Sequence, residues 1–172
     1  MKKLISLCLV LSFVFCLLIS CQPAGNERSE SGQSSTPVSV APLGVTAEEM
    51  AQAVMATVTM PEMVSGSQRV ISSYYDFAVV TDCEDFVCYL TSSGATADEV
   101  GIFVFKSEAE AKEAVKKMEK RRDDQITSFT GYVDTEVPRL QNAKIGTVGR
   151  VAYYIVTSDP TAGVTALEGK LK

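Results

Sequence analysis

The chemistry open to this chain is restricted by one feature of its composition, the complete absence of histidine. Histidine is the most common general base near neutral pH and the most common metal ligand in proteins. Without it, Ser-His-Asp and Cys-His catalysis are excluded. We therefore expect no catalytic residue, no cofactor and no metal site, and we expect that the chain is not an enzyme.

Cys83 and Cys88 are the two cysteines within the candidate folded domain. Two thiols are too few for a zinc site built from cysteine, and their spacing differs from the C-x-x-C redox motif. Outside the cytoplasm two cysteines this close can form a disulfide. Their Cα atoms must then lie within about 7 Å, which requires a bend at Glu84–Asp85. The alternative is two separate thiols, with Cys88 packed as a small apolar residue.

Carboxylates gather around the first of these cysteines and again before the next predicted strand. Asp82, Glu84 and Asp85 flank Cys83, and Asp98–Glu99 follow a turn. Oxygen ligands at this density can bind calcium, but the spacing of an EF-hand is absent. A pair of carboxylates can also serve a glycosidase, which makes a carboxylate-dependent hydrolase an alternative function. We interpret these residues as a solvated loop.

Six basic residues fall on one long predicted helix, where anionic wall polymer or lipid could contact them. They are Lys112, Lys116, Lys117, Lys120, Arg121 and Arg122. Glutamates are interleaved at helical spacing, with Glu108 four residues before Lys112 and Glu113 four before Lys117. We therefore expect a solvated helix face whose charges pair with one another.

Tyrosines occur as two adjacent pairs, Tyr74–Tyr75 and Tyr153–Tyr154. The second pair falls in a predicted strand, where neighbouring side chains point to opposite faces, so one of them should face outward. An exposed tyrosine can mark a binding surface. We interpret them mainly as packing residues.

The N-terminus has the pattern of a secretory leader, with Lys2 and Lys3 followed by an apolar run from Leu4 to Ile19. This run would be about 24 Å long as a helix, and a transmembrane helix needs about 20 apolar residues. It is therefore short for a permanent span. It ends in Leu-Ile-Ser before Cys21, which resembles the lipobox of bacterial lipoproteins.

Cys21 is the cysteine of this region that suits lipid attachment. A small serine precedes it, whereas a bulky leucine precedes Cys8 and a bulky phenylalanine precedes Cys16. The resemblance implies cleavage before Cys21 and a diacylglyceryl group on its thiol; an uncleaved signal anchor is the alternative. Two or three acyl chains hold a protein stably on a bilayer. We expect an extracytoplasmic, lipid-anchored protein of the cell membrane.

The composition divides the chain into a signal peptide at residues 1–20, a lipidated cysteine and tether at 21–44, and a single domain at 45–172. The tether is rich in Ser, Gly, Pro and Gln and carries no apolar period, so we expect it to be flexible. Loss of Lys2 and Lys3 changes the net charge from −5 to −7. Such acidity argues against nucleic-acid binding.

Local patterns in the domain predict helices and strands in alternation. Capping boxes at Thr46–Glu49 and Ser107–Glu110 begin two helices. The first ends before Pro61 and the second extends to about residue 128, with a short helix or turn at 67–75 and a last helix from Asp159. Strands are expected at 86–91, 100–105, 143–148 and 150–157. The order α-(α)-β-β-α-β-β-α indicates an α+β fold, with an antiparallel sheet of about four strands and helices on one face.

Several of these segments resemble a family of uncharacterised lipoproteins from clostridial-type Gram-positive bacteria. The resemblance lies in residues 91–103 (TSSGATADEVGIF), in 107–112 (SEAEAK), in 151–155 (VAYYI) and in Pro61-Glu62-Met63. It covers the domain from about residue 46 to the end and implies a single domain of unknown function on a Gram-positive cell surface. It implies no activity, substrate or catalytic residue.

The functional expectation is therefore a non-enzymatic surface module that binds a partner protein, a wall component or a small ligand. It rests on the absence of a catalytic constellation, the long tether and the small α+β domain. A structural or assembly component of an envelope complex is the main alternative.

Overall fold

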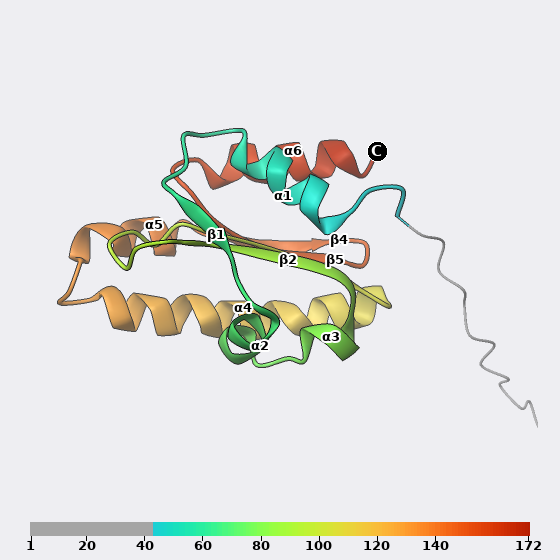
Figure 1. The fold of residues 1–172 in the computed structure, drawn as a ribbon, viewed down its shortest axis with the longest axis horizontal. Coiled ribbons are helices and arrows are strands. Elements are labelled where there is room, and N and C mark those ends of the chain that lie inside the picture. Colours follow the sequence, from blue (N-terminus) through green and yellow to red (C-terminus); the bar gives the residue numbers. More distant parts are fainter. Residues whose placement is uncertain (1–42) are drawn as a thin grey trace, which may run out of the picture. The chain divides into compact units, whose positions relative to one another are not determined.

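The computed structural model describes residues 43–172, which form an α+β domain around one antiparallel sheet (Figure 1). The leader, Cys21 and most of the tether lie outside the described residues. The strands are β1 (Met63–Ser65), β2 (Cys83–Thr91), β3 (Glu99–Phe105), β4 (Lys144–Val148) and β5 (Val151–Val156), in the spatial order β1-β2-β3-β5-β4. The helices are α1 (Ala47–Met55), α2 (Gln68–Tyr75), α3 (Val79–Asp82), α4 (Glu108–Phe129), α5 (Val137–Gln141), preceded by a 3-10 turn at Asp134–Glu136, and α6 (Pro160–Lys170).

The α+β class, the antiparallel sheet and the order of the predicted elements are confirmed. Helices, however, cover both faces of the sheet: α1 and α6 lie on one side, and α2, α3 and α4 lie on the other (Figure 1). The reason is β3, in which every residue from Glu99 to Phe105 is buried. Alternate side chains of a strand point to opposite faces, so a central strand that is apolar at almost every position needs cover on both.

Two hydrophobic clusters therefore flank the sheet. Val100, Ile102 and Ile155 pack toward α1 and α6, and Phe103 and Tyr154 pack toward α2 and α4. Two small residues on the buried face of α4, Ala111 and Ala114, allow this long helix to lie close to the sheet. On this face α4 contacts β3, β4 and β5.

The helix starts follow the predicted capping chemistry. Thr46 and Glu49 form the full reciprocal capping box at α1. At α4 the Ser107 hydroxyl accepts from the Glu110 amide at 3.2 Å and donates to the Glu110 carboxylate at 3.0 Å. The amide of Ala47 also donates to Asp85 on β2 at 2.7 Å. This bond ties the first turn of α1 to the sheet.

The structure adds elements that were not predicted. β1 is a fifth strand of three residues, and it pairs with the last three residues of β2. Three residues are too few to show the alternation of apolar and polar side chains that would predict a strand.

The predicted hairpin of β4 and β5 is confirmed, and it turns at Gly149, whose φ of +56° suits glycine.

Gly101, at the middle of β3, provides a test of this packing. An added Cβ would lie 2.8 Å from a ring carbon of Phe103 and 2.9 Å from the Tyr75 hydroxyl. We expect Gly101→Ala to lower the free energy of unfolding by about 1–3 kcal/mol, because neighbouring side chains must move. Chemical denaturation measures the change. Gly169→Ala, where a Cβ meets nothing within 4 Å, is the control, and equal stability of the two variants would contradict the packing.

Candidate functional site

The carboxylates singled out in the sequence do not form one site. Asp85 accepts from the first turn of α1, Asp82 accepts from the Ala78 amide at 2.9 Å, and Glu84 pairs with Arg150. Glu99 is paired with Leu90 at the far end of the β2–β3 ladder from Cys83. Within residues 43–172 no group of three or more acidic or cysteine side chains is arranged to hold a metal ion.

Cys83 and Cys88 are both free, buried thiols on the same strand. Five steps along an extended strand separate their Cα atoms by about 17 Å, far beyond the reach of a disulfide. The bend that a disulfide requires is absent, because β2 continues through Glu84–Asp85 with only a bulge. This bulge places both side chains in the cluster on the α4 side. The arrangement matches the alternative of two separate thiols.

The polar residues that do converge surround Glu99, which is only 1% exposed. Its carboxylate accepts from the Tyr75 hydroxyl at 2.5 Å and from Arg121 Nη2 and Gln125 Nε2 at 2.9 Å each. Gln125 Oε1 in turn accepts from the Tyr154 hydroxyl at 2.5 Å. Donors from α2 and α4 thus satisfy this buried carboxylate. Through Gln125 the carboxylate is also linked to Tyr154 on β5.

The basic stretch of α4 mostly pairs with its own helix, as expected. Lys112, Lys116 and Lys120 contact carboxylates three or four residues away. The predicted pair of Glu113 with Lys117 is not formed, because Lys117 donates to the Asp76 carbonyl at 2.7 Å. Arg121 was predicted to be solvated, but it points inward to Glu99.

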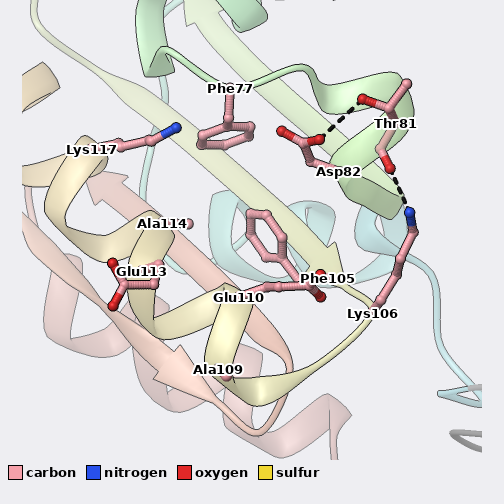
Figure 2. A pocket seen from close by; sticks show the side chains of 10 residues that line it. All are labelled: Phe77, Thr81, Asp82, Phe105, Lys106, Ala109, Glu110, Glu113, Ala114 and Lys117. Carbon is pink, nitrogen blue, oxygen red and sulfur yellow. Dashed lines mark hydrogen bonds between the residues drawn. The ribbon is translucent and has the colours of Figure 1, made fainter. Parts of the chain in front are cut away.

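Two open cavities lie beside α4, one near each end. The cavity at its C-terminal half, of about 330 Å³, has Glu99, Arg121 and Gln125 in its wall; we call it the Glu99 cavity. The cavity at its N-terminal half has a volume of about 360 Å³; we call it the α3–α4 cavity (Figure 2). It is lined by Phe77, Thr81, Asp82, Phe105, Lys106, Ala109, Glu110, Glu113, Ala114 and Lys117.

The α3–α4 cavity combines an aromatic floor with a charged rim. The rings of Phe77 and Phe105 meet edge to face with centroids 5.5 Å apart. Two lysines border them: Lys106 donates to the Thr81 carbonyl at 2.7 Å, and the Lys117 ammonium lies 5.9 Å from the centroid of Phe77 (Figure 2). An apolar group could enter between rings and helix while a polar group stays at the rim.

Residues 56–157 match the model of a family described as a domain of unknown function, DUF4358. The chain belongs to this family. The matched segment contains all five strands and every residue that lines the two cavities beside α4. No curated protein and no solved structure matches the chain. None of the helices between residues 43 and 172 combines the length and the apolarity needed to cross a bilayer.

Burial shifts the titration of several groups in the DUF4358 domain. It raises the pKa of the Cys83 thiol to about 12, helped by the negative charges of Asp82 and Glu110. It also raises the pKa of Cys88 and of the Tyr75 and Tyr154 hydroxyls, with the charge of Glu99 as a further cause. These thiols and hydroxyls therefore stay protonated near neutral pH, which disfavours them as nucleophiles.

These shifts predict that the DUF4358 domain loses stability in alkali. The unfolded chain ionises Cys83 near its ordinary pKa of about 8.5, whereas the folded chain keeps the proton until about pH 12. The contribution of this thiol to the free energy of unfolding should be flat between about pH 7 and 8 and fall above about pH 9, by about 1.4 kcal/mol per pH unit for each such cysteine.

Denaturant titration of the full chain between about pH 7 and 11 measures this slope. Cys83→Ala is the matched variant: it starts less stable because a buried group is lost, but its stability should fall less steeply with pH. An identical slope in both proteins would contradict the assignment.

Proposed function

We propose that the chain is a lipoprotein anchored through Cys21 on the extracytoplasmic face of the cell membrane of a Gram-positive bacterium, and that its DUF4358 domain is a non-enzymatic binding module. The proposed location is supported by the charged and apolar leader, the lipobox-like end before Cys21 and the polar tether that follows. The clostridial type of lipoprotein is supported by the segments that resemble that family.

The binding role is supported above all by the α3–α4 cavity. Small-molecule sites in proteins are concave, mostly apolar and bordered by a few polar groups, and the rings of Phe77 and Phe105 with the surrounding charges match this description. The occupant would be an apolar group with a polar end, carried by a small ligand, a wall component or a partner protein. A ring or a short aliphatic segment suits a volume of about 360 Å³.

The state of Glu99 supports a role other than acid–base catalysis. Both oxygens of this carboxylate already accept hydrogen bonds, from Tyr75, Arg121 and Gln125. A general base needs a lone pair directed at its substrate, and a carboxylate that is saturated by protein donors presents none. The same saturation disfavours the carboxylate-dependent hydrolase.

Lipid attachment is tested at Cys21. We expect Cys21→Ala to abolish metabolic labelling of the protein by an alkyne-bearing fatty acid, because no other cysteine near the leader follows a small residue. Cys16→Ala is the matched control and should be labelled like the natural chain. Labelling that persists in Cys21→Ala would overturn the proposed anchor.

Occupation of the α3–α4 cavity is tested by site-specific photo-crosslinking on intact cells. A photoreactive amino acid replaces Ala109, which is exposed and lines the cavity, or Glu119, which is exposed on the same helix outside both cavities. We expect an adduct of one discrete mass at position 109 and none at position 119. No adduct at 109, or the same adduct at both positions, would contradict a ligand in this cavity.

A further inference from the structure

The Glu99 cavity lies at the other end of α4 from the α3–α4 cavity and differs from it in chemistry. Its wall consists of the segment between β2 and β3, the C-terminal half of α4 and Tyr74 of α2. Side chains with hydroxyl groups, Thr91, Ser93 and Thr96, lie beside the charged residues Glu99 and Arg121. A ligand here would meet hydroxyl and charged groups beside a larger apolar surface.

The charged side chains in the wall of this cavity are each held in an ion pair, and in the surrounding network three carboxylates share two arginines. Arg121 Nη2 lies 2.9 Å from Glu99, and Asp98, which also lines the cavity, lies 2.6 Å from Arg139. Glu136 then contacts Arg139 at 3.4 Å and accepts from the Ala97 amide at 2.9 Å. An anionic ligand would have to draw an arginine away from its carboxylate or remain unpaired. A cationic ligand could reach a carboxylate only by displacing an arginine, because Asp98 and Glu99 are 3% and 1% exposed. Both are costly in a partly buried site.

The same residues nevertheless offer hydrogen bonds to a neutral ligand. Arg121 uses Nε and Nη2 on Glu99, and its Nη1 group donates to nothing within residues 43–172. Thr91 and Ser93 hold the segment between β2 and β3 by bonds of 2.9 and 3.2 Å, and Thr96 donates to Thr91 at 3.3 Å. The Thr91 oxygen accepts the bonds from Ser93 and Thr96 and is saturated, whereas the hydroxyl oxygens of Ser93 and Thr96 keep further lone pairs. Donors and acceptors are thus fixed before a ligand arrives.

An aromatic surface completes the cavity. Tyr74 is 41% exposed, and the Arg121 guanidinium stacks on its ring at 3.9 Å from the centroid. Leu90 and Phe129 contribute apolar surface nearby. A saturated ring with hydroxyl groups around its edge and C–H bonds on its face matches such a mixture of fixed polar groups and apolar surface.

From this combination we infer that the Glu99 cavity binds a neutral, polyhydroxylated ring, the chemistry of a sugar. The inference does not depend on an occupant of the α3–α4 cavity. The burial and pairing of the charged groups set the preference for a neutral ligand. Fixed donors and acceptors recognise its hydroxyl groups, and the surface of Tyr74, Leu90 and Phe129 receives its C–H face.

Three sugars with similar rings and different charges test the inference on the full chain in nanodiscs. N-acetylglucosamine is neutral, glucosamine is cationic and glucuronate is anionic at about pH 6. Saturation-transfer NMR should show saturable binding of N-acetylglucosamine and at least about 10-fold weaker binding of both charged sugars, a difference of about 1.4 kcal/mol. Equal or stronger binding of a charged sugar, or no saturable signal from the neutral one, would overturn the inference.

A cavity-filling variant keeps the test independent of folding. Gly94 lines the Glu99 cavity, and a Cβ added there meets nothing within 4 Å. Gly94→Trp should therefore fold and lose binding of N-acetylglucosamine by at least about 10-fold. Gly169→Trp, at a glycine on α6 that is equally open, should bind like the natural chain. Unchanged binding by Gly94→Trp places the sugar elsewhere and overturns the assignment.

Discussion

A buried carboxylate at the start of the central strand constrains one whole face of this domain. Glu99 can remain charged there only if donors surround it, since an unpaired ion in the interior loses several kcal/mol of hydration. Its donors come from Tyr75 on α2 and from Arg121 and Gln125 on α4. The turn of α2 that carries Tyr75 and the turns of α4 that carry Arg121 and Gln125 must therefore lie within hydrogen-bonding distance of the sheet. Removing one partner of such a pair typically costs about 3–5 kcal/mol.

The position of α4 in turn creates both cavities. In its N-terminal half, small side chains such as Ala111 and Ala114 let the helix lie close to the sheet. Toward its N-terminal end the rings of Phe77 and Phe105 fill only part of the space beneath it. Toward its C-terminal end the polar cluster replaces apolar packing. One cavity thus lies beside the N-terminal half of α4, where apolar packing is incomplete, and the other beside its C-terminal half, where polar groups line the wall.

Local chemistry made much of the fold predictable from the sequence. Strands β2 to β5 and helices α1, α4 and α6 are each predicted by features a few residues apart. These features are apolar residues at regular spacing, capping residues, and glycines or prolines that end an element. The cover on both faces was also implicit, because the segment 100–105 is apolar on both faces. What escaped was β1, which is too short for a period, and the turn-like helices α3 and α5.

The polar cluster could not be predicted because its members are distant in sequence and each has an ordinary local explanation. Asp98–Glu99 follow a turn and Arg121 lies in a run of surface charges, so both are typical of solvated residues. One signal was available: on α4, Arg121 lies three residues after the buried Met118 and four before the buried Gln125. Helical spacing places all three on the inner face.

The fate of the basic stretch on α4 supports a role for its charges within the domain. Arg121 forms an ion pair with Glu99. Lys117 donates to the carbonyl of Asp76, which ends α2 in the left-handed backbone conformation. Lys112, Lys116 and Lys120 are neutralised by nearby carboxylates. In a chain whose net charge is already negative, pairing of this kind leaves little positive field for a polyanion. The ligands proposed for the two cavities would therefore be recognised by shape and hydrogen bonding.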